Sequence, residues 1–403
     1  MIRWLIFITI ILFIDFYAFQ SIKTITKNKI VLISYWLLSI AVLANIAYNI
    51  NTIGESRGLS QQVMFAFGLL ILTLTPKIIA LIVLFSEDIF RVFKTGFNYF
   101  SSSKTTNFFP ERRTFVSKLA LGLAAIPFST VLYGMFRGKY NFQVVKHTLY
   151  FEDLPTAFDG YKLTHISDIH SGSFDDEEKI SYGIDLINKQ ESDVILFTGD
   201  IVNNTADEMT PWIPLFSKLK AKDGKFSVLG NHDYGEYTRW KTNAEKEQNF
   251  QAIKDIHPEI GFNLLLNDSV YLEKETDKIA LVGVENWGTR FKKVGNLNLA
   301  SSKIENHDFK ILMSHDPSHW EQEVKNHSNN YQLTLSGHTH GMQFGIEIPG
   351  IKWSPVQYIY KHWAGVYKEF GKYINVNRGF GFLAFPGRVG IWPEITVITL
   401  KKK

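Results

Sequence analysis

Cysteine does not occur in the 403-residue chain. Its absence excludes disulfide bonds, thiolate metal ligands and a cysteine nucleophile, and it fits either side of a membrane equally well. The formal net charge at neutral pH is only +4, which does not favour a nucleic acid as a partner. Internal repeats and low-complexity tracts are also lacking. The length allows more than one domain, at about 100–200 residues for each.

Hydrophobic residues make up 45% of the chain and are concentrated in its first third. A helix that crosses a membrane needs about 20 mostly apolar residues. Four segments come near this length: residues 4–19, 30–50, 63–85 and 115–136. We therefore predict a membrane region with about four transmembrane helices in residues 1–136. The alternative, a set of buried helices in a soluble core, is disfavoured because four such runs occur within so short a stretch.

Two ionisable residues lie inside these apolar segments. Asp15 interrupts the first segment, where it is either a functional residue or a residue near the membrane interface. Lys77 directly follows Pro76 in the third segment, and this pair predicts a kink or a position in the interior of the bundle.

Basic residues flank the four segments unevenly, and basic flanks tend to stay in the cytoplasm. The loops after the first and third segments contain Lys23, Lys27, Lys29, Arg91, Lys94, Lys104, Arg112 and Arg113. The opposite flanks contain only Arg3, Arg57, Arg137 and Lys139. With four spans, this bias predicts an integral protein of the plasma membrane whose residues 137–403 lie outside the cytoplasm.

A different pattern follows the membrane region. Residues 137–157 read as a tether with a first strand, and residues 158–403 as a separate domain. Polar stretches in this domain alternate with short strand-like runs: KLTHIS, DVILFTGD, KFSVLG, KIALVGV, KILMSH and YQLTLS. Residues 175–190 begin with acidic residues and place Ile180, Ile184 and Ile187 at helical spacing. This alternation predicts an α/β domain with buried sheets.

Polar side chains follow five of the predicted strands, at the point where each strand ends. In α/β sheets, functional groups gather at the carboxyl ends of the strands. The side chains at these exits are Asp168, His170, Asp200, Asn231, His232, Asp233, His315, Asp316, His338 and His340. We therefore expect them to line one common edge.

The chemistry of these groups favours metal ions. Carboxylate, carboxamide and imidazole ligands without sulfur suit Mn, Fe, Zn, Co or Ni. These side chains are too many for one tetrahedral ion, but seven ligands drawn from them fit two divalent ions about 3.5–4 Å apart that share one carboxylate. Asp200, which stands alone at its strand end, is the natural bridge. Neighbouring glycines permit the tight turns that such a site needs.

The motifs DIH, GD, GNHD, a later H and GHTH occur in this order, each after a predicted strand. In this pattern the chain resembles the calcineurin-like metallophosphoesterase superfamily over roughly residues 140–403. HISDIHSG, TGDIV and LGNHDYG are most similar to its membrane-attached branch, the YkuE- and YaeI-type phosphodiesterases. The resemblance implies that a two-layer β-sandwich flanked by helices follows the predicted transmembrane helices.

The resemblance also implies a role for each motif residue. Asp168, His170 and His340 are expected to bind the first metal, and Asp200 to bridge both. Asn231, His315 and His338 are expected to bind the second metal. His232 would contact the phosphate or protonate the leaving group, and Asp233 would orient His232.

These expectations describe a metal-dependent phosphoesterase that hydrolyses a phosphodiester or pyrophosphate P–O bond with a metal-bridging hydroxide. A membrane anchor favours a lipid-linked or cell-envelope substrate. Two alternatives stay open: hydrolysis of soluble nucleotide or sugar phosphates, and a non-catalytic membrane interaction protein with a structural metal site. Arg378 and Arg388 are expected either to reach the substrate phosphate or to be structural. Phe380, Phe382, Phe385 and Trp392 are expected to line an acyl-chain groove or to pack in the core.

Overall fold

The structure is a computed structural model that describes residues 2–53, 60–100 and 110–403. The chain divides into two compact units, one formed by the N-terminal helices and one that runs from Phe136 to Lys403. Arg57 and Lys104, which contributed to the predicted orientation, lie outside the described residues.

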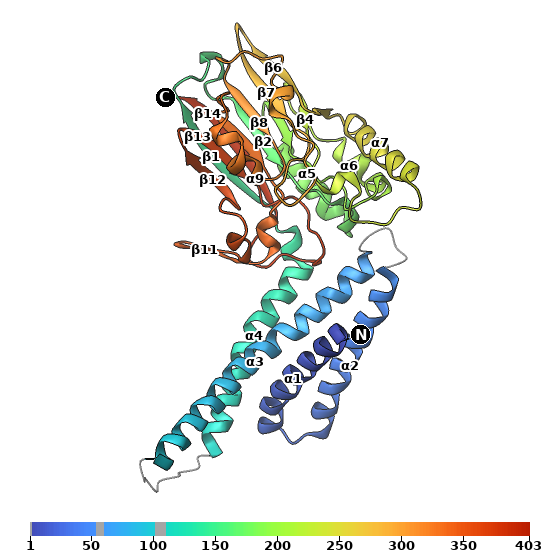
Figure 1. Ribbon diagram of the computed structural model, residues 1–403, viewed down its shortest axis with the longest axis vertical. Coiled ribbons are helices and arrows are strands. Elements are labelled where there is room, and N and C mark those ends of the chain that lie inside the picture. The colour runs from blue at the N-terminus through green and yellow to red at the C-terminus, as the bar shows by residue number, and fades with distance from the viewer. Residues whose placement is uncertain (1, 54–59, 101–109) are drawn as a thin grey trace. The chain divides into compact units, whose positions relative to one another are not determined.

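The N-terminal unit consists of four long helices (Figure 1). They are α1 (Ile2–Ile25), α2 (Lys29–Ile53), α3 (Gln61–Phe100) and α4 (Pro110–Phe136). All four are long and apolar enough to cross a membrane, which confirms four apolar helices where the sequence predicted them. Large apolar side chains such as Ile30 and Leu37 are 74% and 61% exposed. Exposed apolar surface of this extent is typical of helices that face lipid.

A polar cluster lies inside this helical unit. The Asp15 side chain is only 1% exposed, and Lys77 Nζ lies 2.5 Å from its Oδ1. Lys77 also donates to Ser39 Oγ at 2.7 Å, and the Tyr35 hydroxyl donates to the Asp15 carbonyl at 2.8 Å. Three helices therefore meet at one ion pair, which confirms the interior position predicted for Lys77 and makes Asp15 a buried, paired carboxylate.

The second unit is built on two six-stranded sheets and one hairpin (Figure 1). The first sheet has the order β1 (Gln143–Phe151), β14 (Glu394–Lys402), β2 (Lys162–Ile166), β3 (Val194–Phe197), β4 (Lys225–Ser227) and β5 (Asn263–Leu264). The second has the order β12 (Gly365–Glu369), β13 (Lys372–Val376), β9 (Leu333–Ser336), β8 (Lys310–Met313), β7 (Asp277–Gly283) and β6 (Asp268–Lys274). The hairpin pairs β10 (Ile346–Ile348) with β11 (Ile351–Trp353). The six predicted strand runs are confirmed as β2, β3, β4, β7, β8 and β9.

Alternating side chains join the two sheets into a sandwich. Leu163 and Leu196 point between the sheets, where they pack with Ile311 and Leu335 of the second sheet. Phe197, the neighbour of Leu196, belongs instead to the cluster on the outer face. A strand exposes successive residues to opposite faces, so each central strand contributes to two cores at once.

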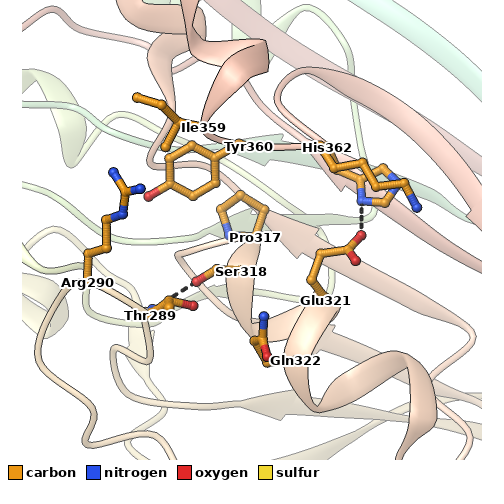
Figure 2. A pocket seen from close by; sticks show the side chains of 10 residues that line it. Thr289, Arg290, Pro317, Ser318, Glu321, Gln322, Ile359, Tyr360 and His362 are labelled. Carbon is orange, nitrogen blue, oxygen red and sulfur yellow. Dashed lines mark hydrogen bonds and ion pairs between the residues drawn. The ribbon is translucent and has the colours of Figure 1, made fainter.

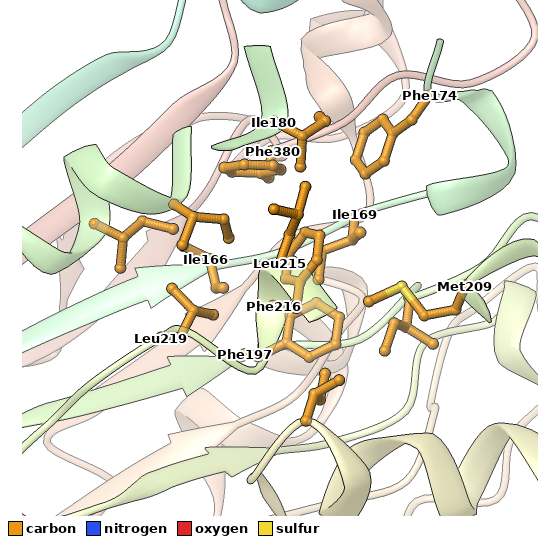
Figure 3. Close-up of a cluster of buried hydrophobic side chains, with 14 of the residues drawn as sticks. Ile166, Ile169, Phe174, Ile180, Phe197, Met209, Leu215, Phe216, Leu219 and Phe380 are labelled. Carbon is orange, nitrogen blue, oxygen red and sulfur yellow. The ribbon is translucent and has the colours of Figure 1, made fainter. Parts of the chain in front are cut away.

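Helices cover both outer faces of the sandwich. Those on the first sheet are α5 (Glu177–Asn188), α6 (Ile213–Phe216) and α7 (Asn243–Glu259), whose apolar side chains form one buried cluster with Phe197. Figure 3 shows part of this cluster, including Ile180, Leu215 and Phe216. Those on the second sheet are α8 (Leu297–Ala300) and α9 (Ser318–Gln322). The predicted helix is confirmed as α5: Asp176 caps it by accepting from Lys179 N, and Ile180, Ile184 and Ile187 are buried.

Phe380 and Phe382 belong to the core between the first sheet and its helices, and they are 0% and 1% exposed. Of the two uses expected for these aromatic residues, core packing therefore applies to this pair.

Strand direction determines where the motif residues meet. β2, β3, β4 and β5 run parallel in the first sheet, and β7, β8 and β9 run parallel in the second. All the motif residues follow the carboxyl ends of these strands, so the sandwich delivers them to a common edge.

Candidate metal centre

Five of the seven predicted ligands have a left-handed backbone. Their φ angles are 53° at Asp168, 48° at His170, 60° at Asp200, 69° at His338 and 49° at His340. Such angles are uncommon for residues other than glycine, and each costs on the order of 1–3 kcal/mol. Strain of this kind concentrates at functional sites, where the surrounding fold imposes it to aim side chains inward.

The first group consists of Asp168, His170 and His340, which offer ligand atoms within 4.8 Å of one another. His340 Nε2 lies 3.2 Å from Asp168 Oδ1. Nε2 of His170 and Nε2 of His340 are both buried, and neither has a hydrogen-bond partner among the described residues. A buried polar nitrogen without a partner is costly, and a metal ion would satisfy both.

A neighbouring amide fixes the protonation of His170. The Asn203 amide nitrogen donates to Ser173 Oγ at 3.0 Å, so Asn203 Oδ1 is turned toward His170 Nδ1 at 3.1 Å and accepts its proton. The lone pair of His170 is therefore at Nε2, the unpartnered nitrogen. Orientation of a ligand imidazole by a second hydrogen bond is usual in metal sites.

The second group brings Asp200, His315 and His338 within the same 4.8 Å, with Asn231 beside them. Asn231 Oδ1 lies 2.8 Å from His338 Nδ1 and 3.1 Å from His315 Nε2. His315 Nδ1 donates to the carbonyl of Thr198 at 2.7 Å, so Nε2 is the nitrogen that faces the site. That nitrogen lies 3.1 Å from Asp200 Oδ2 and 3.3 Å from His338 Nδ1. Carboxylate, carboxamide and imidazole atoms that converge in this way form a site for a cation, either a proton or a divalent metal ion.

Asp200 joins the two groups. Its Oδ2 lies 3.5 Å from His170 Nε2 in the first group and 3.1 Å from His315 Nε2 in the second. Gly230 allows this approach, because a Cβ at that position would lie 2.2 Å from Asp200 Oδ1. The structure thus brings together all seven residues that the sequence predicted as ligands.

The charges of the site reinforce one another. Burial opposes ionisation of Asp168, but His340 outweighs it and holds the pKa of the carboxyl well below its usual value. Burial is likewise outweighed at Asp200, whose pKa is lowered mainly by His315 and His232. Burial would lower the pKa of His315, but the Asp200 carboxylate raises it to about 10. Both carboxylates are therefore ionised at neutral pH, and the site favours positive charge.

Comparisons with known proteins agree with this geometry. Residues 161–342 match the family model of the calcineurin-like phosphoesterases, and residues 2–139 match that of a probable calcineurin-like phosphoesterase transmembrane domain. The chain is 31% identical over 275 residues to the uncharacterized metallophosphoesterase YkuE of Bacillus subtilis (strain 168), which covers 67% of this chain and 89% of the relative. The chain belongs to the calcineurin-like metallophosphoesterase family. It is therefore a metal-dependent phosphoesterase, a hydrolase of phosphoric ester bonds.

Two further relatives also match this chain, one of them over nearly its whole length. An uncharacterized metallophosphoesterase of Helicobacter pylori (strain ATCC 700392 / 26695) is 23% identical over 401 residues, covering 98% of each chain. Phosphodiesterase YaeI of Escherichia coli (strain K12) is 26% identical over 266 residues, covering 64% of this chain and 88% of the relative. The resemblance to the membrane-attached branch is confirmed, and this metallophosphoesterase is a membrane protein.

His232 lies beside both ligand groups. Its backbone nitrogen donates to Asp200 Oδ1 at 2.8 Å, and its ring packs against His170 at 4.9 Å between centroids. We expected Asp233 to orient this ring, but the partner of His232 Nδ1 is the backbone carbonyl of Asn203, at 2.7 Å. Burial lowers the pKa of His232.

Asp233 instead holds the backbone of two strand exits together. Its carboxyl oxygens accept from the backbone nitrogens of Asp200, Ile201 and Gly230 at 2.8–2.9 Å. Burial, reinforced by the charge of Asp200, raises the pKa of Asp233 to about 7. Asp233 thus contacts the site through the backbone of Asp200, a predicted ligand, and not through the ring of His232.

Three supporting residues were not predicted from the sequence. Asn203 contacts both His170 and His232, and its place three residues after Asp200 in the same strand exit was an available signal. Glu208 accepts from the backbone nitrogens of residues 203–205, and burial raises its pKa to about 7. Tyr360, whose hydroxyl lies 2.9 Å from His338 Nε2, has no motif around it that pointed to the site.

The two arginines with an open assignment are structural. Arg378 pairs with Glu347 at 2.6 Å and with the buried Glu394. Arg388 is fully buried, donates to backbone carbonyls including Gly381 O at 2.9 Å, and places Nη2 3.2 Å from His340 Nδ1. Both side chains are thus engaged within the fold.

A third group of possible ligands, Glu321, His362 and Glu369, lies outside the motif residues. Lys325 pairs with both carboxylates, at 2.8 Å and 3.3 Å, and Lys361 pairs with Glu369 at 2.5 Å. Because the lysines already neutralise the carboxylates, this group is a structural charge network.

Proposed function

We propose that this metallophosphoesterase is a membrane-anchored, dinuclear enzyme that hydrolyses a phosphodiester or pyrophosphate bond in a lipid-linked or cell-envelope substrate. One observation carries the dinuclear part. Two separate groups of acceptor atoms share the single carboxylate of Asp200, at 3.5 Å and 3.1 Å from a histidine of each group.

The donor set fits two divalent ions of the borderline class: Mn, Fe, Zn, Co or Ni. Asp168, His170 and His340 would hold the first ion, Asn231, His315 and His338 the second, and Asp200 would contact both. When bound, such ions lower the pKa of a coordinated water toward about 7 and neutralise charge on the phosphoryl oxygens.

His232 supplies the proton in this proposal. The carbonyl of Asn203 accepts from its Nδ1–H, so Nε2 is the nitrogen that faces the departing oxygen, and it delivers a proton when the ring is protonated on both nitrogens. Asp233 is a positioning residue, since it ties the backbone of Asp200 to that of Gly230.

The membrane region supports the choice of substrate and location. We propose that residues 1–136 anchor the enzyme in the plasma membrane, that residues 137–157 form a tether, and that the catalytic domain, residues 158–403, acts outside the cytoplasm. The support is the charge bias of the flanks, where Lys23, Lys27 and Lys29 follow the first span. A hydrolase held at the bilayer encounters substrates at that surface more often than soluble ones.

Elemental analysis of the purified, detergent-solubilised enzyme, combined with a substrate panel, tests the chemistry. We expect two divalent ions per chain and hydrolysis of phosphodiesters or diphosphates in preference to phosphomonoesters. Asp200→Asn should abolish hydrolysis and reduce the metal content while circular dichroism stays unchanged. One ion per chain, or full activity in Asp200→Asn, would refute the dinuclear site.

A second comparison tests the substrate. The detergent-solubilised enzyme is assayed on a lipid phosphodiester in mixed micelles and on a water-soluble nitrophenyl phosphodiester. We expect a higher kcat/KM for the lipid substrate. Equal or lower values would favour soluble nucleotide or sugar phosphates, with the membrane region serving only as an anchor.

The orientation can be tested with single cysteines, because the chain contains none. Ser302→Cys places a thiol at an exposed position of the catalytic domain, and Lys27→Cys places one in the loop after the first span. With a membrane-impermeant maleimide on intact cells, we expect Ser302→Cys to be labelled and Lys27→Cys to react only after lysis. The reverse pattern would place the catalytic domain in the cytoplasm.

A further inference from the structure

A pocket of about 270 Å³ adjoins the second ligand group (Figure 2). Tyr360 connects the two, because it lines the pocket while its hydroxyl lies 2.9 Å from His338 Nε2. Arg290 and Thr289 also line the pocket, and the backbone nitrogen of Thr289 donates to Ser318 Oγ at 3.0 Å. Tyr360 thus contacts both the pocket and His338, a proposed metal ligand.

The hydroxyl proton of Tyr360 is directed by His338. If His338 binds a metal through Nδ1, the nitrogen that faces Asn231 and His315, then Nε2 carries the ring proton. That proton is donated to the Tyr360 oxygen, which leaves the O–H of Tyr360 free to donate to a group in the pocket. This step depends on the proposed function of the site.

Arg290 differs from the neighbouring cations. Lys361, also in the pocket, pairs with Glu369 at 2.5 Å, and Lys292, on the same loop, pairs with Glu236 at 3.2 Å. Arg290 has no ion pair within the described part of the chain, and its guanidinium points toward the Tyr360 hydroxyl in Figure 2. An unpaired guanidinium beside a free hydroxyl proton forms a donor set for an oxyanion, and arginine matches phosphate in particular.

The loop that carries Arg290 is held against the site. Phe291, the next residue, packs its ring against His338 at 4.6 Å between centroids. At Gly288 a Cβ would lie 2.4 Å from Asp316 Oδ2, so the glycine lets the loop approach that buried carboxylate. Arg290 therefore stands between two anchored residues, at a short reach from the metal ligands.

We propose that this pocket binds the phosphate group next to the scissile one, and that the enzyme therefore prefers diphosphate esters to simple phosphodiesters. Hydrolysis adds one water across the P–O–P bond: the hydroxyl joins the scissile phosphorus, and the second phosphate departs with the bridging oxygen. Arg290 and Tyr360 stabilise the charge on the departing phosphate. The proposal rests on the proposed function and narrows its substrate class.

Two substrates that share a uridine 5′-phosphate test the proposal on the purified full-length enzyme. One is UDP-glucose, which contains the second phosphate, and the other is the p-nitrophenyl ester of uridine 5′-monophosphate, which lacks it. We expect Arg290→Gln to lower kcat/KM for UDP-glucose by about 10- to 100-fold, the loss typical of a charge-assisted hydrogen bond, and to change the diester value by less than about threefold. Tyr360→Phe should show the same selectivity.

Lys292→Gln is the matched control, since it removes a cation from the same loop that points away to Glu236. It should change kcat/KM for both substrates by less than about threefold. Calorimetric binding of methylenediphosphonate, which is not hydrolysed, gives a readout apart from turnover and should weaken by about tenfold in Arg290→Gln.

The outcomes separate the two proposals. Hydrolysis of the diester but not of UDP-glucose by the unmodified enzyme would overturn the diphosphate subsite, as would equal losses on both substrates in Arg290→Gln. Failure of the unmodified enzyme to hydrolyse these two substrates and the lipid phosphodiester alike would overturn the proposed function, and the subsite with it.

Discussion

Replacing His232 with alanine separates proton transfer from metal binding. The side chain of His232 is not part of either ligand group, and its ring is bonded through Nδ1 to the carbonyl of Asn203. The contact of His232 with Asp200 is made by its backbone nitrogen, at 2.8 Å, and alanine retains that N–H. We therefore expect His232→Ala to keep the metal content of the unmodified enzyme.

The size of the effect depends on the leaving group. A positioned general acid contributes about 10²–10⁴-fold when the departing oxygen must be protonated, or about 2.7–5.4 kcal/mol of barrier at 1.36 kcal/mol for each factor of ten. An alkoxide needs that proton, whereas nitrophenolate departs as an anion. We therefore expect kcat to fall by about 10²–10⁴-fold on a dialkyl phosphodiester and by less than about tenfold on a nitrophenyl ester.

The assay combines kcat on both substrates with elemental analysis of the same preparation. Asp200→Asn serves as the control that should lose metal and activity together. Loss of metal from His232→Ala would show that His232 is a ligand. Equal losses on the two substrates would show that it binds the phosphate instead of protonating the leaving group.

Three further changes test the structure away from the proton donor. Asp15→Leu leaves Lys77 buried without its partner, 2.5 Å away, and should lower the free energy of unfolding by about 3–5 kcal/mol in thermal denaturation in detergent, whereas Asp15→Leu combined with Lys77→Met should recover much of the loss. Burial lowers the pKa of His257 to about 3, below its usual value of 6.5, so the unfolded chain binds the proton more tightly. Stability should therefore fall as the pH drops below about 6.5, by roughly 2–3 kcal/mol at pH 4.5, and His257→Phe should remove this part of the pH dependence. Gly337→Ala would place a Cβ 2.2 Å from Asp168 Oδ2, so elemental analysis should show loss of metal from the first group, and an unchanged metal content would contradict the geometry.

Much of the fold was predictable because its signals are local. The run DVILFTGD alternates two faces, and the structure confirms them: Leu196 lies between the sheets and Phe197 under the helices. The pairing of β1 with β14 was not predictable, since residues 143–151 join residues 394–402 across nearly the whole domain. No local pattern specifies which strand lies beside which.

The identity of the ligands was predictable, but the way the fold holds them was not. Strand exits concentrate functional side chains, so listing those exits identified Asp168, His315 and the other members of the site. The predicted partner of His232, Asp233, was wrong. The actual partner is the backbone carbonyl of Asn203, and sequence does not reveal it because every residue offers such a group. Tyr360 was missed for a related reason: its hydroxyl reaches His338 through a loop that carries no motif.

The left-handed backbone of the ligands shows how the fold and the site depend on each other. Five strained residues at about 1–3 kcal/mol each, together with two buried carboxylates, make this edge of the sandwich unfavourable by itself. Three backbone hydrogen bonds to Asp233 and the buried contacts of Asn203 hold the exits of β2, β3 and β4 in place. The core between the two sheets can sustain that strain because its side chains, among them those of Leu163 and Leu335, are buried. A cation that enters the site then meets acceptors already in position, and its binding energy goes into affinity rather than into ordering the ligands.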